Sequence, residues 1–545
     1  MLPLNLSSWL AAFSIFGLAS SRPQFHDGYP RVIDIDVTRY RFSIVLSDQA
    51  DSIAVEATVD FRFLGAGRTS LPLDLIERNP AGKGMTVESV SDSVGRLEFV
   101  HREGKLIIAL RGPGVAGAVG RVRIGYRGTP AAGLKIAPNR SGDRTFSSDN
   151  WPDLARHWLA TIDHPSDKAA VEFVVTAPAH YQVVANGLLV EETDVAPGIR
   201  RTTWRQSVPI APWLFTVGVA RYAVEHSGTV NGIPVQAWVY PQDRDQGFAD
   251  FGGPTQRALR FYGSWVGPYA YEKLANIESV AAGGGMEAAS AIGYTERLIG
   301  APRANEVIVH EIAHQWFGNA VTERDWNDVW LSEGFATYFT LLFTEYDAGR
   351  DAFVAGLKKS KATVLDYDAK HPGYRVVHAN LTDMTQVTSS QTYQKGSWTL
   401  HMLRGIVGTD TFWRGIREYY RRFFNGNAST DDFRQVMEEV SGQELAWFFN
   451  QWLTRSGSPV VAGAWQYDRA KKQVELTLTQ SQPGDPFRVP LEIGIGLPGV
   501  PDLRIERVNL TGQHATFRFD ADQEPTEIVL DPNLWVLLVT KLVKR

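Results

Sequence analysis

At 545 residues the chain is longer than a single hydrophobic core usually serves, so about three domains are expected. Hydrophobic residues make up 44% of the chain and charged residues 21%, which is typical of a globular protein with ample core material. The formal net charge of −5 argues against nucleic acid as a partner, and the absence of cysteine excludes disulfides, thiolate nucleophiles and thiolate metal ligands.

The N-terminus carries an apolar run from Trp9 to Ala19 that is too short to span a bilayer comfortably. Small residues follow it, as at a signal-peptide cleavage site, although no lysine or arginine precedes Arg22. We therefore expect residues 1–21 to be a signal peptide, no integral membrane span, and export to the periplasm or the outside. The alternatives are an uncleaved amphipathic extension, a lipid-facing anchor, or a cytoplasmic protein if the run is not a signal.

Residues 27–228 show the period-two alternation of half-buried strands. One such stretch runs from Ile53 to Phe63 and another from Val171 to Val175, and glycine and proline punctuate the region. Many short strands between turns predict an N-terminal β-sandwich. Residues 229–456 instead show helical spacing, and residues 457–545 return to alternation. The fold class is therefore multidomain α+β, with a mostly helical middle domain and a small C-terminal β-sandwich.

The middle region contains the pattern His310-Glu311-Ile312-Ala313-His314. Residues four apart on a helix share one face, so both imidazoles can reach one zinc ion, and Glu311 can take a proton from a water molecule bound there. Gly318 ends this helix, and a second helical run begins at Trp330. It carries Glu333, which is separated from His314 by eighteen residues and can supply a third ligand. A chance occurrence of the short pattern is the alternative, but the added glutamate favours a zinc hydrolase.

A glycine run precedes Glu287. Consecutive glycines such as Gly284 and Gly285 let another backbone approach closely, as a substrate peptide pairing with an exposed strand requires. A carboxylate directly after them can bind a free ammonium group. The alternative is a flexible hinge followed by a solvated glutamate, and the neighbouring zinc pattern favours the functional interpretation.

Three motifs in this order carry a resemblance to a known family. They are the zinc pattern with Glu333, the segment Gly284-Gly285-Met286-Glu287-Ala288, and the segment Tyr393-Gln394-Lys395-Gly396. The chain resembles the aminopeptidase N family of gluzincin metallopeptidases (peptidase M1 type), which includes the leukotriene hydrolases. Its second segment is similar to the family's Gly-x-Met-Glu-Asn exopeptidase motif, and its third is similar to the catalytic-tyrosine motif.

The resemblance implies a thermolysin-like catalytic domain and one Zn²⁺ per chain, held by His310, His314 and Glu333. It assigns Glu311 as the general base, Tyr393 as the donor that stabilises the oxyanion, and Glu287 with Gly284 and Gly285 as substrate-binding residues. It also places Asp149 where the family has an N-terminal-domain Gln or Glu that contacts the substrate's amine. The family often continues into a large helical domain, which is not expected here because the chain ends at Arg545.

Several of these assignments have plain structural alternatives. Asp149 could instead cap a surface turn, and Tyr393 could be a core tyrosine at the start of a helix. Thr337 could orient a zinc ligand or bond its own helix backbone, and this choice stays open. Ala288 departs from the family's Asn, which puts the contacts to the substrate backbone in doubt.

The sequence thus predicts a monomeric, zinc-dependent aminopeptidase that removes the N-terminal residue from peptides with a free N-terminus. The alternatives are a zinc epoxide hydrolase or an endopeptidase using the same site, or a catalytically silent peptide-binding protein. The sequence does not specify which first residue is preferred.

Overall fold

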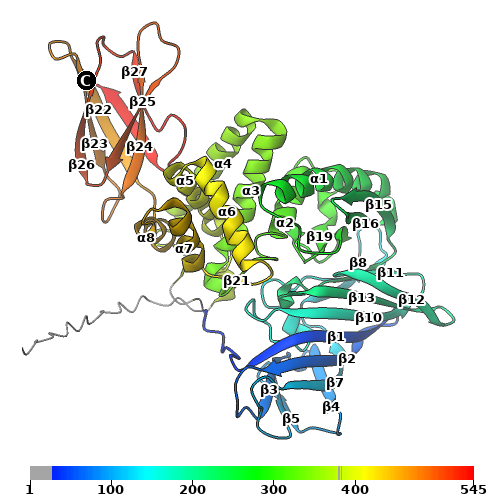
Figure 1. Cartoon of the computed structure of the whole chain (residues 1–545). Helices are drawn as coiled ribbons and strands as arrows, with labels where there is room; N and C mark the ends of the chain where they lie inside the picture. The colour runs from blue at the N-terminus through cyan, green and yellow to red at the C-terminus, as the bar shows by residue number, and fades with distance from the viewer. Residues whose placement is uncertain (1–26, 379–380, 382) are drawn as a thin grey trace, which may run out of the picture.

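The structure is a computed structural model that describes residues 27–378, 381 and 383–545. Its chain forms three regions in a bent row, with a helical region between a β-rich N-terminal region and a β-rich C-terminal region (Figure 1). The expected signal peptide lies outside the described residues and stays a prediction. In the described part of the chain, no helix is long and apolar enough to cross a membrane.

The N-terminal region contains three sheets. In strand β2, every second residue from Ile53 to Phe63 is buried, as the alternation predicted. The strand orders are β12-β13-β10-β1-β2-β7-β4, β11-β14-β9-β8 and β3-β6-β5. The strands are β1 (Ile35–Ser47), β2 (Ala50–Phe63), β3 (Ser70–Asp74), β4 (Gly84–Ser91), β5 (Phe99–Arg102), β6 (Lys105–Ala109), β7 (Val119–Thr129), β8 (Leu134–Pro138), β9 (Arg144–Ser148), β10 (Ala169–Pro178), β11 (Gln182–Ala185), β12 (Leu188–Ala196), β13 (Ile199–Ile210) and β14 (Val217–Ala220).

The middle region combines helices with a five-stranded sheet of order β15-β16-β17-β19-β18. Its strands are β15 (Ala223–Val230), β16 (Ile233–Val239), β17 (Leu274–Ser279), β18 (Gly285–Met286), β19 (Ala291–Thr295), β20 (Thr322–Glu323) and β21 (Asn427–Ala428). Its helices are α1 (Arg244–Trp265), α2 (Ala304–His314), α3 (Trp330–Ala348), α4 (Arg350–Lys370), α5 (Gly396–Val407), α6 (Thr409–Phe423), α7 (Thr430–Ser441) and α8 (Ala446–Phe449). The short β18 lies at the edge of the five-stranded sheet, so one side of this strand is available for pairing.

The predicted boundary between residues 228 and 229 falls inside β15, which pairs with β16 of the middle region. Sheet pairing would place that boundary before Ala223. The alternation in β15 is like that of the strands before it, and alternation alone does not say which sheet a strand joins. The division of the chain into domains stays a prediction.

The C-terminal region is built from a four-stranded sheet, β26-β23-β22-β28, and a three-stranded sheet, β25-β24-β27. Its strands are β22 (Val460–Asp468), β23 (Gln473–Gln480), β24 (Val489–Gly496), β25 (Arg504–Leu510), β26 (His514–Asp520), β27 (Glu527–Leu530) and β28 (Val539–Lys544). The predicted multidomain α+β class, with β-rich ends and a helical middle, is confirmed.

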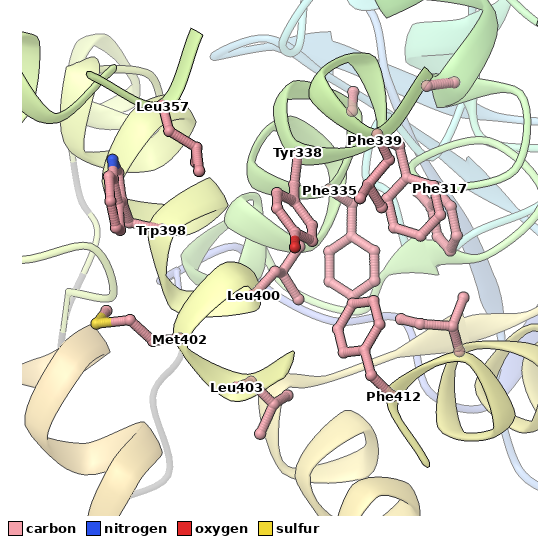
Figure 2. Close-up of a cluster of buried hydrophobic side chains, with 14 of the residues drawn as sticks. Phe317, Phe335, Tyr338, Phe339, Leu357, Trp398, Leu400, Met402, Leu403 and Phe412 are labelled. Atoms are coloured by element: carbon pink, nitrogen blue, oxygen red, sulfur yellow. The ribbon is translucent and has the colours of Figure 1, made fainter. Parts of the chain in front are cut away.

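The core between α3 and its neighbours fixes the helices that carry the zinc pattern (Figure 2). The ring of Phe317, in the turn after α2, lies with its centroid 4.8 Å from that of Phe335 and 4.5 Å from that of Phe339, both on α3. On another face of α3, Gly334 meets Gly396 of α5, where an added Cβ would lie 2.9 Å from the Cα of Gly396. These contacts hold α2, α3 and α5 at fixed distances from one another.

Candidate active site

The three predicted metal ligands lie together. His310 and His314 follow each other by one turn of α2, and their Nε2 atoms are 3.1 Å apart. Oε2 of Glu333, from the first turn of α3, lies 3.5 Å from Nε2 of His310 and 3.3 Å from Nε2 of His314. Two helices that pack against each other therefore bring two imidazole nitrogens and a carboxylate oxygen to one point.

The electrostatic environment between His310, His314 and Glu333 favours a bound cation. Oε2 of Glu333 is buried, yet it accepts no hydrogen bond from the described residues. A buried carboxylate oxygen without a donor is costly unless a positive charge compensates it. Two neutral histidines and one carboxylate, with one position left for substrate or water, are a common ligand set of catalytic zinc.

Contacts of its Nδ1 atom, on the side of the ring away from the metal position, orient His314. Its Nδ1 lies 3.2 Å from the main-chain carbonyl of Phe317 and 2.9 Å from Oγ of Ser332. An Nδ1–H donated to a carbonyl leaves the lone pair of Nε2 facing the metal position. Gly318 is required beside this pair, because its φ is +108° and an added Cβ would lie 2.2 Å from Oγ of Ser332.

Glu311 belongs to a second group of residues that could bind a cation. A carboxylate oxygen of Glu311, a carboxylate oxygen of Glu287 and a ring nitrogen of His314 lie within 4.8 Å of one another. Burial and the neighbouring Glu287 raise the pKa of Glu311 well above its usual range. Gly285 packs directly on this side chain, and a Cβ there would lie 2.2 Å from Oε1 of Glu311. The expected close backbone approach thus occurs at Gly285, whereas a Cβ at Gly284 would meet open space.

Glu287 follows the edge strand β18 and is buried. Its Oε1 lies 3.9 Å from Nδ1 of His314 and has no hydrogen-bond partner among the described residues. Burial, together with the negative charge of Glu333, raises the pKa of Glu287. The structure therefore has a carboxylate oxygen without a hydrogen-bond partner next to His314, one of the predicted metal ligands.

Gln315 and Asn319 fix the backbone of Glu287, and sequence reasoning did not identify either of them. The carbonyl of Glu287 accepts hydrogen bonds from Nε2 of Gln315 at 2.9 Å and from Nδ2 of Asn319 at 2.6 Å. Lys168 of the N-terminal region braces the same turn by donating to the carbonyls of Asn319 and Ala320. The short spacing of Gln315 and Asn319 from His314 was the only signal in the sequence.

Asp149 follows β9 in the N-terminal region. Its Oδ1 accepts a hydrogen bond from the backbone N–H of Trp151, so it does cap a turn, as the alternative interpretation expected. Burial raises the pKa of Asp149 to about 6. Its charge also raises the pKa values of Glu287 and Glu311.

Tyr393 lies on a π-helical turn, Gln391–Lys395, that leads into α5. Its hydroxyl donates a hydrogen bond of 2.9 Å to Oε1 of Glu333, and its ring stacks on that of His310 with centroids 6.1 Å apart. π-Helical turns often occur at functional sites because they redirect one side chain. The phenol is thus directed at the metal position rather than into the core.

The fold and the ligand set are typical of zinc metallohydrolases, and comparisons with known proteins point the same way. The sequence model of the peptidase family M1 domain matches residues 253–452. Glutamyl aminopeptidase of Mus musculus is 27% identical over 365 residues, which are 64% of this chain and 38% of that protein. Aminopeptidase M1 of Arabidopsis thaliana is 24% identical over 464 residues, 80% of this chain and 51% of that protein. The chain thus spans about half or less of the length of these relatives.

Solved structures show the same similarity. An M1 zinc metallopeptidase from Deinococcus radiodurans is 25% identical with a TM-score of 0.67, and the match covers 77% of this chain and 93% of that one. Aminopeptidase A of Legionella pneumophila, solved with aspartic acid, has a TM-score of 0.81 at 18% identity and covers 95% of this chain and 60% of that one, which shows a shared fold. Residues 253–452 therefore resemble the peptidase family M1 domain, and two histidines with one glutamate are a ligand set that suits Zn²⁺.

Proposed function

We propose that the chain is a zinc-dependent aminopeptidase that removes the N-terminal residue from peptides. The observation that carries this proposal is the buried, unpaired carboxylate of Glu287 beside the metal position. A free ammonium group is the natural partner of such a carboxylate, and binding it there places the first peptide bond at the metal.

His310, His314 and Glu333 would hold the metal. Held by these residues, zinc would supply a positive charge that polarises the scissile carbonyl and lowers the pKa of the attacking water. Glu311 would take a proton from the attacking water and deliver it to the leaving amine, because its carboxylate lies within 4.8 Å of the ligand atoms of His314 and Glu287. Tyr393 donates to the oxyanion that develops on the carbonyl, and in the resting structure its hydroxyl instead bonds Glu333.

The substrate backbone would be held by the free edge of β18. Gly285 of this strand lies flat against Glu311, so a peptide can approach without meeting a side chain. Adding an extended peptide to a sheet edge uses main-chain hydrogen bonds and tolerates many sequences. Glu287, at the end of the strand and supported by Asp149, would then stop the peptide at its amino end.

An assay with aminoacyl-nitroanilides tests the proposal. We expect turnover that chelation abolishes and added zinc restores, whereas N-acetylated peptides should be poor substrates. Internal cleavage of N-blocked peptides at the rate of free ones would identify an endopeptidase instead. Turnover of an epoxide but of no peptide would identify an epoxide hydrolase, and zinc and peptide binding without any turnover would identify a silent binding protein.

Export and a monomeric state complete the proposal. Mass spectrometry of protein from the native host should find a mature N-terminus just after residues 19–21. An intact Met1 in a cytoplasmic fraction would contradict export. Light scattering at micromolar concentration measures the oligomeric state, and a dimer mass would contradict the monomer.

A further inference from the structure

A pocket of about 340 Å³ opens next to His310 and Glu311, and its lining mixes polar and apolar side chains. Neither His314 nor Glu287 lines it, so it lies at the opposite end of the metal-binding turn from the carboxylate of Glu287. The pocket is formed between helices α2, α3 and α4. The lining residues that matter below are Arg303, Glu306, Thr337, Lys359 and Ser360.

The position of the pocket gives it a place in the reaction, and this step depends on the proposed function. If Glu287 holds the substrate's ammonium, the first residue lies on the His314 side of the metal. The residue after the scissile bond then continues past His310 and Glu311, into the pocket. A volume of about 340 Å³ is at the small end of ligand sites, which suits one or two residues rather than a long chain.

The inner wall of the pocket carries free hydroxyl groups. Oγ1 of Thr337 and Oγ of Ser360 are buried and make no hydrogen bond with any described residue. Thr337 therefore neither orients a zinc ligand nor bonds its own helix backbone, the two roles that the sequence left open. Buried polar atoms in proteins usually have a partner, so these two hydroxyls are placed to bond a ligand.

The outer rim carries more positive than negative charge. Arg303 precedes α2, and Lys359 lies on α4. Both side chains are exposed, and in the described part of the chain neither takes part in an ion pair, unlike most arginines of this protein. Glu306, in the first turn of α2, is the acidic residue on the same rim.

We propose that this pocket binds the end of a short peptide, and that Arg303 and Lys359 hold its C-terminal carboxylate. Thr337 and Ser360 would bond the main chain or a polar side chain of the second residue. The preferred substrates are then dipeptides and tripeptides with a free carboxylate, since a longer chain carries its carboxylate beyond these two cations.

The test compares matched substrates that share one first residue: a nitroanilide, a dipeptide acid and the same dipeptide as its amide. The nitroanilide has no carboxylate, so its turnover measures hydrolysis that does not depend on carboxylate binding. We expect kcat/KM to be about three- to tenfold higher for the acid than for the amide, the range for partly exposed charge pairs. In a length series, kcat/KM should be highest for dipeptides and tripeptides and fall for longer peptides.

Two variants locate the effect. In Arg303→Gln and Lys359→Gln, the ratio of acid to amide should fall toward one, while nitroanilide turnover and zinc content stay unchanged. Lys358→Gln is the matched control, because Lys358 is exposed on the same helix but does not line the pocket. Equal rates for acid and amide in the unaltered protein, or an unchanged ratio in both variants, would overturn the proposal.

A binding measurement separates this inference from the proposed function. Calorimetric titration of zinc-loaded Glu311→Gln with the dipeptide acid and amide measures the preference without turnover. Tighter binding of the acid, lost in the Arg303→Gln background, supports the pocket even if no peptide is cleaved. Equal binding of the two overturns the pocket even if nitroanilides are cleaved.

Discussion

Replacing Glu287 by Gln tests the group on which the exopeptidase interpretation depends. The amide has nearly the same shape, and the backbone stays fixed because Gln315 and Asn319 hold the carbonyl of residue 287. The substitution therefore removes charge with little movement. A hydrogen bond to a charged group contributes about 1.5–3 kcal/mol, so kcat/KM for free-amine peptides should fall by a factor of roughly 10 to 100.

The assay measures kcat/KM for a free dipeptide and for an N-acetylated peptide, with zinc content determined on the same samples. The difference between the two substrates should shrink in Glu287→Gln while zinc content stays the same. Glu278→Gln is a suitable control, because burial raises the pKa of Glu278 to about 9 and the change leaves its charge at neutral pH unaltered. If Glu287→Gln trims free peptides at the unaltered rate, Glu287 does not bind the amine, and the reasoning from its unpaired oxygen fails.

Four further substitutions have distinct expected outcomes. Glu311→Gln should keep its zinc but lose nearly all turnover in the nitroanilide assay, and substantial activity would refute its role as the base. Tyr393→Phe should lower kcat by a factor of about 100 or more with little change in KM, typical of losing one oxyanion donor, and a near-normal kcat would return Tyr393 to a structural role. Asn319→Ala removes one of two bonds to the carbonyl of Glu287, so kcat/KM for free-amine substrates should fall about tenfold at unchanged zinc content; an unchanged value would show that Gln315 suffices. Asp149 has a pKa of about 6 in the folded protein against 3.8 normally, so the folded state binds its proton more tightly and the stability from this group is present below about pH 4 and lost as pH rises through 6. Asp149→Asn should therefore raise the melting temperature at pH 8 more than at pH 4, while KM for free-amine substrates rises. Equal shifts at the two pH values would contradict the raised pKa of the Asp149 carboxyl.

The metal ligands could be predicted because their geometry is mostly local. Two of them share one turn of a helix, which fixes their separation whatever the rest of the fold does. Glu333 needed one further assumption, that its helix returns against the first, and the packing of Phe317 on Phe335 and Phe339 provides that contact. The β-rich ends were predictable for the same reason, since alternation is a property of each strand alone.

The contacts that position these groups could not be predicted, because they depend on tertiary structure. Nothing in the sequence marks Ser332 as a partner of His314. Their contact requires a residue without a side chain at Gly318, where a Cβ would lie 2.2 Å from Oγ of Ser332. Gln315 and Asn319 have the composition of any polar helix end, and only the return of the chain through β18 places the carbonyl of Glu287 between their amides. The pocket beside His310 depends on α4, a helix for which no motif in the sequence gave a signal.

The charges of the site explain why it needs partners from outside the chain. The negative charges of Glu333 and Asp149 raise the pKa values of both Glu287 and Glu311. In the part of the chain that the structure describes, no lysine or arginine pairs with any of them, and the ion pairs of Glu287 and Glu333 involve only the histidines. A purely structural cluster would be neutralised by its own cations, because buried unpaired charge destabilises a fold. Here Oε2 of Glu333, which accepts no hydrogen bond, faces the two imidazole nitrogens. Oε1 of Glu287, which also accepts none, lies on the other side of the His314 ring, 3.9 Å from its Nδ1. The first position suits a permanently bound dication and the second a transient monocation. In the proposed reaction, a metal ion and a substrate's ammonium group would meet these two requirements in that order, and the separation of the two positions would select the first peptide bond.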